Sequence, residues 1–382
     1  MRQKTSVKRI GVLTGGGDCP GLNAALRAVV KTAIFQYGMS VRAFKSGYAG
    51  LIEDRTVQLG TNDVSNILTL GGTIIGTSNT ANPFRYPVRR RGRSVFVNVS
   101  RRALRVFRKH ELQALVCIGG DGTLKIANRL FALGMPVVGV PKTIDNDVKE
   151  ADVTFGFHTA VQIATEAIDR LHTTAMAHHR VMVVEVMGRY AGWIALAAGI
   201  AGGGDVILIP EVPFDIDAVC RWIKERNRRG KKFSIVVVAE GAMPIGGSVV
   251  VQQIVKDSTD PFRLGGISQK VATEIERRTR IVTRVTVLGH LQRGGTPTAF
   301  DRILATRYGS EAVHAVARGE FGVMVALKGQ EIVTVPLEQA VGEPRLVPLE
   351  SDLIRAALDV GTCLGDDKLR PHQDRLNQQG AG

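Results

Sequence analysis

The chain has 382 residues, 44% hydrophobic and 22% charged, which is ordinary for a soluble α/β protein and allows two or three domains. No apolar run in the sequence reaches the ~18 residues that a membrane span needs. The basic N-terminus leads directly into the first predicted strand, so we expect no cleaved signal peptide and a cytoplasmic protein. The formal net charge of +15 favours anionic ligands.

Strand and helix patterns alternate along the chain. The order is strand 10–13, helix 24–35, strand 41–44, strand 115–118, helix 126–133 and strand 137–140. A second series follows, with a helix from 157 to about 172, strand 180–186, helix 189–201, and strands 206–209 and 233–238. This alternation is typical of βαβ units and predicts an α/β fold in two halves, each with a parallel sheet.

Three of the predicted strands run into glycine-rich acidic loops. These are Gly15-Gly16-Gly17-Asp18, Gly119-Gly120-Asp121-Gly122-Thr123 and Pro141-Lys142-Thr143-Ile144-Asp145-Asn146-Asp147. Loops at the carboxyl ends of strands are where open α/β sheets bind ligands, and glycine lets backbone N–H groups approach phosphate oxygens. Carboxylates supply Mg²⁺ ligands and a base for an acceptor hydroxyl. Together the loops predict phosphoryl transfer.

Positive charge is concentrated between residues 64 and 110, where the sequence has no acidic residue. The ten basic residues there are Arg85, Arg89, Arg90, Arg91, Arg93, Arg101, Arg102, Arg105, Arg108 and Lys109. They could bind a polyanion or an effector phosphate. A solvated loop and helix face that also steers phosphorylated substrates explains them as well, and the segment lacks the interleaved aromatic residues of a nucleic-acid platform, so we expect no nucleic-acid partner. The four cysteines are scattered and predict free thiols.

The loops and several further motifs resemble the phosphofructokinase family over roughly residues 8 to 335. The further motifs are Met187-Gly188-Arg189, Pro210-Glu211, Ala239-Glu240-Gly241 and Leu288-Gly289-His290-Leu291-Gln292-Arg293-Gly294-Gly295. The resemblance implies two doubly wound α/β domains with the active site in the cleft between them. It also implies that the chain crosses between them, with residues 1–156 and about 291–345 forming the phosphate-donor domain. Residues 157–290 and about 346–382 then form the sugar-phosphate domain.

The resemblance also implies site residues. Asp145 corresponds to the general base, assisted by Thr143, and Arg189 lies at the phosphoryl-transfer centre. Asp121 corresponds to the Mg²⁺ ligand. The donor ATP would contact Gly16, Gly17, Tyr48, Asn79, Gly120, Asp121, Gly122 and Thr123. The sugar phosphate would contact Thr143, Asp145, Arg180, Met187, Gly188, Arg189, Glu240, Arg284, His290 and Arg293.

Two of these arginines bear on assembly. In the family, the residues that correspond to Arg180 and Arg284 reach in from a neighbouring subunit. The resemblance therefore implies a homodimer or homotetramer. The function implied is that of an Mg²⁺-dependent 6-phosphofructokinase of glycolysis, which transfers the γ-phosphate of ATP to the 1-hydroxyl of fructose 6-phosphate.

The phosphoryl donor has an alternative. Gly122 matches ATP-using family members, whereas pyrophosphate-dependent members carry an aspartate there that blocks the α-phosphate. Lys142 instead matches pyrophosphate users, and the glycine–lysine combination resembles one ATP-using branch. A pyrophosphate-dependent enzyme is therefore the nearest alternative.

Asn79 departs from the family pattern. The family has an arginine there that bridges donor and acceptor, and an amide carries no charge, so turnover could be slow. Alternatively, Arg85 or another arginine of the basic segment supplies the charge, or the acceptor is not fructose 6-phosphate. A further alternative is a catalytically weakened regulatory paralogue that binds sugar phosphate. The presence of Asp121, Asp145 and Arg189 argues against it.

Overall fold

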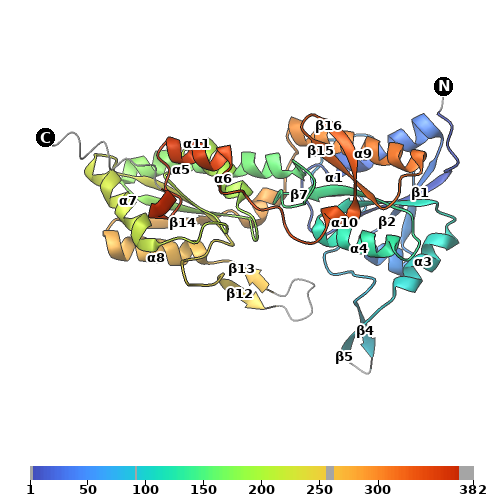
Figure 1. The fold of residues 1–382 in the computed structure, drawn as a ribbon, viewed down its shortest axis with the longest axis horizontal. Coiled ribbons are helices and arrows are strands. Elements are labelled where there is room, and N and C mark those ends of the chain that lie inside the picture. Colours follow the sequence, from blue (N-terminus) through green and yellow to red (C-terminus); the bar gives the residue numbers. More distant parts are fainter. Residues whose placement is uncertain (1–2, 91–92, 255–261, 370–382) are drawn as a thin grey trace. The chain divides into compact units, whose positions relative to one another are not determined.

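The chain divides into two compact units in a computed structural model that describes residues 3–90, 93–254 and 262–369. Unit 1 consists of Met1–Thr159 and Arg293–Arg345, and unit 2 of Ala160–Gln292 and Leu346–Gly382. The chain therefore passes from one unit to the other after Thr159, Gln292 and Arg345. The α/β class expected from the alternating pattern is confirmed in both units (Figure 1).

Unit 1 is built on a sheet with the strand order β16-β15-β7-β6-β1-β2-β3, and the short β8 pairs with β7. The inner strands are parallel, and the outermost pairs, β16 with β15 and β3 with β2, are antiparallel. The strands are β1 (Arg9–Gly15), β2 (Ser40–Phe44), β3 (Thr56–Leu59), β6 (Ala114–Gly119), β7 (Val137–Thr143), β8 (Phe155–Gly156), β15 (Val323–Lys328) and β16 (Glu331–Pro336). The central strands β6 and β7 are buried along their whole length, as expected for parallel strands covered on both faces.

Helices cover both faces of this sheet (Figure 1). On one face, α1 (Leu22–Thr32), which continues as a π-helical turn (Ala33–Tyr37), packs against α9 (Ala299–Arg318). Gly309 of α9 is so close to α1 that an added Cβ would lie 2.4 Å from the Ala25 carbonyl oxygen. On the other face, α2 (Tyr48–Glu53), α3 (Ser100–Lys109), α4 (Asp121–Phe131) and α10 (Leu337–Ala340) contribute to one hydrophobic core.

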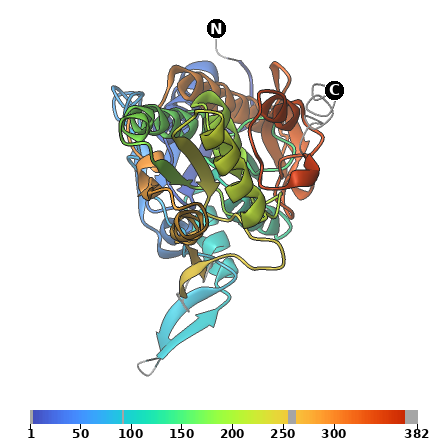
Figure 2. The same ribbon diagram turned by 90° about the vertical axis from the view of Figure 1, so that its left-hand side faces the viewer.

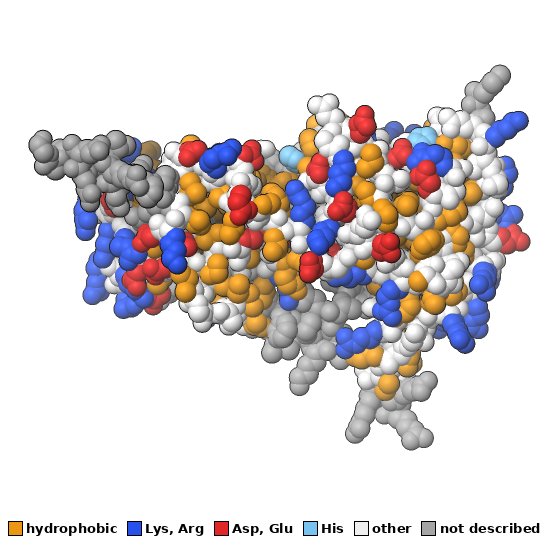
Figure 3. All heavy atoms as spheres, in the orientation of Figure 1, with side chains coloured by type: hydrophobic (Ala, Val, Ile, Leu, Met, Phe, Trp, Pro, Cys, Tyr) orange, Lys and Arg blue, Asp and Glu red, His pale blue; other side chains and the backbone are white. Residues whose placement is uncertain are grey.

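The basic segment forms a hairpin of β4 (Tyr86–Arg90) and β5 (Arg93–Val97), followed by α3. The hairpin extends away from the sheet of unit 1 (Figure 2). Helix α3 buries Ala103, Val106 and Phe107 and leaves its basic side chains exposed, and Figure 3 shows lysine and arginine side chains over this region. The guanidinium of Arg85 lies 4.3 Å from the centre of the Phe96 ring in the hairpin. Arg85 therefore contacts an aromatic ring of the hairpin.

Unit 2 has a smaller, fully parallel sheet with the order β10-β11-β9-β14. The strands are β9 (Val181–Val186), β10 (Val206–Leu208), β11 (Ser234–Ala239) and β14 (Thr283–Val287), with a separate hairpin of β12 (Val251–Ile254) and β13 (Phe262–Leu264). Its helices are α5 (Phe157–His178), α6 (Trp193–Ala201), α7 (Ile216–Arg228), α8 (Ile267–Thr279) and α11 (Asp352–Asp359). Short 3-10 turns occur at Gly289–Arg293 and Asp367–Leu369.

Two helix boundaries in unit 2 differ from the prediction. Helix α5 continues to His178, six residues past the expected end, because alanine and threonine extend the pattern without a breaker. Helix α6 begins at Trp193 and not at 189, because Gly188 has a φ of 135° and Gly192 is the N-cap. Among the described residues, no helix combines the length and the hydrophobicity that crossing a bilayer takes. All four cysteines are free and buried.

Candidate active site

The three glycine-rich loops of unit 1 leave the sheet at one edge. Parallel pairing sets Gly15 opposite Gly119, and Gly119 opposite Pro141, so β1, β6 and β7 end side by side. The convergence predicted from the sequence is confirmed. Ligands of open α/β sheets bind at such an edge, outside the carboxyl ends of the strands.

The first loop is held by the segment that carries Asn79. The Gly16 N–H donates to the Ser78 carbonyl oxygen at 3.0 Å, and the Thr77 hydroxyl donates to the Gly16 carbonyl oxygen at 2.7 Å. Asn79 follows Ser78 directly and is exposed. The segment after Gly76 therefore lies beside the first glycine-rich loop, Gly15-Gly16-Gly17-Asp18.

Two cations also bind this loop through its backbone. The Lys142 ammonium donates to the Gly17 carbonyl oxygen, and the Arg293 guanidinium donates to the Asp18 carbonyl oxygen at 3.1 Å. Lys142 is only 3% exposed, and burial lowers its pKa. A Cβ on Gly17 would lie 2.8 Å from the Arg293 guanidinium, so a larger residue there would shift the end of the Arg293 side chain. Because the bond to Asp18 uses only Nη1, Arg293 could keep it while other N–H groups of the guanidinium hold a sugar phosphate, as the resemblance implies.

The second loop opens helix α4 at Asp121. Gly120 is the N-cap and no side chain caps the helix, so backbone N–H groups of the first turn are available to an anion. Nothing lies within 4 Å of the position that a Cβ on Gly122 would take. Tyr48 is buried, and its hydroxyl donates to the Thr123 carbonyl oxygen at 2.8 Å. The Tyr48 side chain can therefore act on a donor phosphate only through Thr123, and not by contact.

The third loop carries Asp145 in a braced conformation. The Asp145 N–H donates to the Thr143 hydroxyl at 3.1 Å, and Asn146 is left-handed with a φ of 54°. Buried Thr154 donates its hydroxyl to the Thr143 carbonyl oxygen at 2.7 Å and its N–H to the Asn146 side chain at 2.9 Å. A left-handed non-glycine residue persists only where its surroundings fix it, and such strain gathers at functional sites.

Asp145 has the environment of a general base. Its Oδ1 atom is buried and accepts no hydrogen bond from the described residues. Burial raises the pKa of Asp145, while the charges of Arg293 and Lys142 oppose the rise. Burial also raises the pKa of Asp147 to about 7, and the charge of Asp145 adds to this effect. A carboxylate with a raised pKa and an unpaired oxygen is suited to accept a proton near neutral pH.

No group of three or more histidine, cysteine, aspartate or glutamate side chains in the described part of the chain is arranged to hold a metal ion. Asp121 pairs with Lys125 at 2.7 Å and is partly exposed beside the open space at Gly122. Mg²⁺ commonly uses one or two carboxylates together with substrate phosphates and water, so a single carboxylate fits this ion.

In unit 2, the predicted sugar-phosphate residues fall into two groups. Met187, Gly188 and Arg189 follow β9, Glu240 follows β11, and His290 follows β14. These strands are parallel neighbours, so the three segments leave one edge of the sheet.

The other group, Arg180 and Arg284, lies at the opposite edge. Arg180 directly precedes β9, and Arg284 is the second residue of β14, paired with Met182. The six residues of β9 separate the two edges by roughly 20 Å at ~3.3 Å per residue. Unit 2 of a single chain therefore does not bring Arg180 and Arg284 together with Arg189.

Two side chains that had no predicted role hold these loops. The Met187 N–H donates to the side-chain oxygen of Gln292 at 3.3 Å, and Gln292 is fully buried and also donates to the Gly289 carbonyl oxygen at 3.1 Å. The Glu211 carboxylate accepts from the Gly192 N–H at 3.0 Å and from the Val347 N–H at 2.9 Å. Both residues stand inside quoted motifs, but motif membership alone did not indicate which loops they join.

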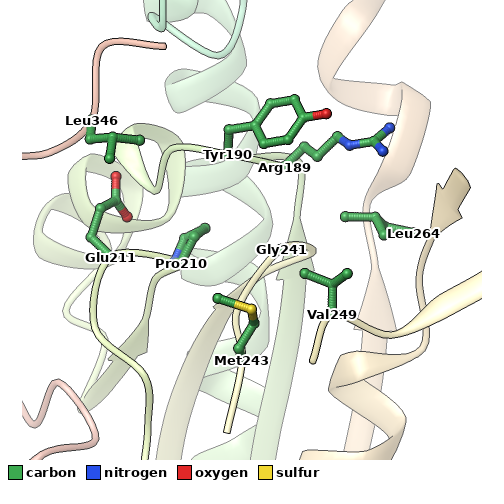
Figure 4. Close-up of a pocket in the computed structure, with 9 residues that line it drawn as sticks. All are labelled: Arg189, Tyr190, Pro210, Glu211, Gly241, Met243, Val249, Leu264 and Leu346. Atoms are coloured by element: carbon green, nitrogen blue, oxygen red, sulfur yellow. The ribbon is translucent and has the colours of Figure 1, made fainter. Parts of the chain in front are cut away.

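A pocket of about 230 Å³ lies beside the Arg189 loop. It is lined by Arg189, Tyr190, Pro210, Glu211, Gly241, Met243, Val249, Leu264 and Leu346 (Figure 4). Figure 4 shows the Glu211 carboxylate on the side of Leu346, with the Arg189 side chain extending toward the side of Leu264. Burial raises the pKa of Glu211, and the N–H donors of Val347 and Gly192 oppose the rise.

Comparison with known proteins agrees with this geometry. A family model described as Phosphofructokinase matches residues 9–316. ATP-dependent 6-phosphofructokinase 2 of Clostridium perfringens (strain 13 / Type A) is 52% identical over 362 residues, covering 94% of this chain and 99% of the relative. Pyrophosphate–fructose 6-phosphate 1-phosphotransferase of Amycolatopsis mediterranei (strain S699) is 54% identical over 343 residues, covering 90% of this chain and 97% of the relative.

A solved structure also matches. The T-state crystal structure of Pichia pastoris phosphofructokinase is 32% identical, with a TM-score of 0.75 over 99% of this chain, which spans only 39% of that longer chain. The match of the family model over most of the chain, together with relatives more than 50% identical over nearly their whole length, carries the assignment that the motifs suggested. The chain belongs to the phosphofructokinase family.

Proposed function

We propose that the protein is a 6-phosphofructokinase that transfers the γ-phosphate of ATP to the 1-hydroxyl of fructose 6-phosphate. The observation that carries this proposal is the Asp145 loop. It holds a buried carboxylate with an unpaired oxygen at the edge where two glycine-rich loops also end. The Clostridium relative with this activity in its name supports the proposal.

Asp145 takes the proton of the sugar hydroxyl as the oxygen attacks the terminal phosphate, with Thr143 holding the loop. Lys142 and Arg293 sit close enough to oppose the rise in the pKa of Asp145, so they also favour its charged form. Arg189 donates to the phosphoryl group, because a guanidinium can form two parallel hydrogen bonds to phosphate oxygens.

Unit 1 would bind the phosphoryl donor. Gly17 and Gly120 would offer backbone N–H donors to its phosphates. Gly16 and Thr123 would line the same site, with their own N–H groups bonded to the Ser78 and Gly120 carbonyl oxygens. Asp121 would hold Mg²⁺, which neutralises charge on the donor phosphates when it is bound. Asp121 is partly exposed and would supply one carboxylate ligand to the ion. Phosphate oxygens and water would complete the coordination of Mg²⁺.

Unit 2 would bind the sugar phosphate. Met187, Gly188, Glu240 and His290 leave the same edge of its sheet and would contact the sugar and its 6-phosphate. Arg180 and Arg284 lie at the other edge, so these two residues would serve the site of a neighbouring copy in a homo-oligomer. A cytoplasmic location also remains our prediction.

The donor proposal depends on Gly122. Open space beside Gly122 at the start of α4 leaves room for a nucleotide α-phosphate. Two observations favour pyrophosphate as the second candidate: the buried ammonium of Lys142 at the first loop, and the name of the Amycolatopsis relative. Replacement of the family's arginine by Asn79 keeps a weakened regulatory paralogue as a third candidate.

Purified protein should be assayed with fructose 6-phosphate and Mg²⁺, with ATP or pyrophosphate as the donor. We expect turnover with ATP. Gly122→Asp should abolish it, because a carboxylate beside the α-phosphate adds bulk and negative charge. Gly122→Ala is the matched control and should retain ATP turnover, since the methyl group meets nothing within 4 Å.

Two results would decide against ATP transfer, and a third would decide against the placement of the nucleotide beside Gly122. Turnover with pyrophosphate alone would assign the chain to the second candidate. Sugar-phosphate binding without turnover on either donor would assign it to the third. Undiminished ATP turnover in Gly122→Asp would show that the nucleotide lies elsewhere.

A further inference from the structure

A short segment after α10 contacts two loops of unit 1, the loop that begins α4 at Asp121 and the loop that carries Asp145. We call residues 341–345 the strap. At its start, the Gly342 N–H faces the Asp121 carboxylate at 3.4 Å, and Lys125 donates to the Gly342 carbonyl oxygen at 2.9 Å. At its end, Arg345 reaches the loop that carries Asp145. The strap lies beyond residue 316, where the match to the family model ends.

Arg345 binds that loop at two consecutive carbonyl groups. Its N–H donates to the Asp147 carbonyl oxygen at 2.8 Å, and its guanidinium donates to the Asn146 carbonyl oxygen at 3.2 Å. These are the two carbonyl groups that follow Asp145 in the chain. The peptide groups on the C-terminal side of the proposed base are therefore both fixed by one residue.

The loop needs such support because Asn146 is left-handed. Its φ of 54° is unfavourable for a residue with a Cβ, and its side chain is already engaged by the Thr154 N–H. Thr143 and Thr154 hold the loop before and around Asn146. Arg345 holds the carbonyl group of Asn146 itself. Without the guanidinium, the peptide after Asn146 could rotate, and the Asp145 carboxylate would move with the loop.

We infer that Arg345 is a positioning residue for Asp145: its guanidinium fixes the loop so that the carboxylate meets the acceptor hydroxyl. This inference rests on the proposed role of Asp145 as general base. A carboxylate displaced by a fraction of an ångström still binds substrate but accepts the proton less efficiently, because proton transfer depends on hydrogen-bond reach. The effect therefore falls on kcat more than on KM.

The test compares Arg345→Ala with Glu343→Ala as a matched control from the same strap. Glu343 is 86% exposed and pairs with Lys149 at 3.2 Å on the surface. We expect Arg345→Ala to lower kcat about tenfold with the KM of fructose 6-phosphate within about threefold. Glu343→Ala should leave both unchanged, and Arg345→Lys should recover part of kcat, because an ammonium still donates to the Asn146 carbonyl.

A double variant separates positioning from a merely structural role. In an Asp145→Asn background, Arg345→Ala should lower the residual rate less than twofold, because the carboxylate it positions is gone. An equal loss in both backgrounds would overturn the inference, as would native kcat in folded Arg345→Ala. If Arg345→Ala does not fold, Arg345→Met keeps the aliphatic stem without the donor and is held to the same expectations.

The failure of this inference is distinguishable from failure of the proposed function. Native turnover of Asp145→Asn would remove the base and the proposed mechanism with it. Impaired Asp145→Asn together with native Arg345→Ala would remove only the role of Arg345.

Discussion

The glycine-rich loops of unit 1 and the loops of unit 2 that carry Arg189, Glu240 and His290 both follow parallel strands, but they are not held in the same way. In unit 1, side chains reach across the sequence to fix loop backbone, as Lys142 does at Gly17 and Thr154 at Thr143. In unit 2, Gln292 and Glu211 also bind loop backbone, but glycine adds direct backbone contact, since a Cβ on Gly241 would lie 2.0 Å from the Arg189 carbonyl oxygen. Arg284 is meanwhile 54% exposed.

The difference matches what each region would have to do. A group that moves a proton must be placed within hydrogen-bond reach of a single atom, so its loop needs several independent supports. Long arginine side chains can find a doubly charged phosphate from a range of positions, so exposure costs them less. Changes at the Asp145 loop should therefore act mainly on kcat, and changes at the sugar-phosphate loops of unit 2, Arg189 excepted, mainly on the KM of fructose 6-phosphate.

The largest expected effect is that of Asp145→Asn. An amide cannot accept the proton, so kcat should fall by ~10²–10⁴, while the KM of fructose 6-phosphate should stay within a few-fold. Steady-state kinetics on the folded, oligomeric variant checks this. Unchanged turnover would contradict the comparison between the units, because the Asp145 loop would then not take part in the reaction.

Asn79→Arg should act in the opposite direction. The segment of Asn79 is hydrogen-bonded to the first phosphate loop, so an arginine there would add charge beside the donor. We expect kcat/KM to rise by ~10-fold, which corresponds to 1.4 kcal/mol of differential stabilisation. The measurement is the rate with ATP and fructose 6-phosphate.

No gain in folded Asn79→Arg would mean that another cation already supplies the charge. Lys142 then becomes the candidate, because Arg85 is engaged at Phe96. A gain in substrate affinity without a gain in turnover would mean that residue 79 contacts the bound substrates but does not stabilise the transition state.

Gln292→Leu tests unit 2. The substitution leaves the Met187 N–H and the Gly289 carbonyl without their buried partner, which costs about 1–3 kcal/mol of folding stability. The KM of fructose 6-phosphate should rise several-fold with kcat changed less than twofold. Thermal unfolding and steady-state kinetics measure the two effects, and a drop in kcat with constant KM would contradict the division between the units.

The smallest expected effect concerns pH. The pKa of Asp147 is raised to about 7 by burial and by the charge of Asp145. Burial also raises the pKa of Asp145, the proposed base, so its protonated form accumulates as pH falls through that pKa and kcat should decline on the acid side. Asp147→Asn removes a like charge from the pair, so the acid limb of the kcat profile should move to lower pH. A limb that stays in place would mean that the pair does not control the rate.

Much of the fold could be predicted from local pattern. Strands such as β6 and β7 are buried on both faces and so read as continuous apolar runs, which made them and the loops after them visible. Helix α3 and the hairpin before it were seen only as a basic segment, because arginine dominates their composition. The start of α6 was misplaced because the glycines that delay it belong to the Met187-Gly188-Arg189 loop.

The supports of the site could not be predicted in the same way. Thr154 and Arg345 act on carbonyl groups that are 11 and 199 residues away in the chain. Every residue has the same backbone carbonyl group, so the sequence does not indicate which carbonyl a side chain will bind. No periodicity links residues at such separations. The chemical groups were therefore predictable from motifs, whereas the residues that orient them required coordinates.

The three passages of the chain between units have a consequence for synthesis. Unit 1 takes its strands β15 and β16 and the strap from Arg293–Arg345, which are made only after residues 160–292 of unit 2. A nascent chain that has emerged only to Thr159 lacks the strand that pairs with β7 and the helix that covers α1. Because domains of growing chains fold as their segments appear, unit 1 cannot be completed until residues 160–292 of unit 2 have been made. An exposed β7 edge during that interval is a pairing surface for other chains, so expression yield should depend on chaperone supply more than the stability of the finished protein suggests.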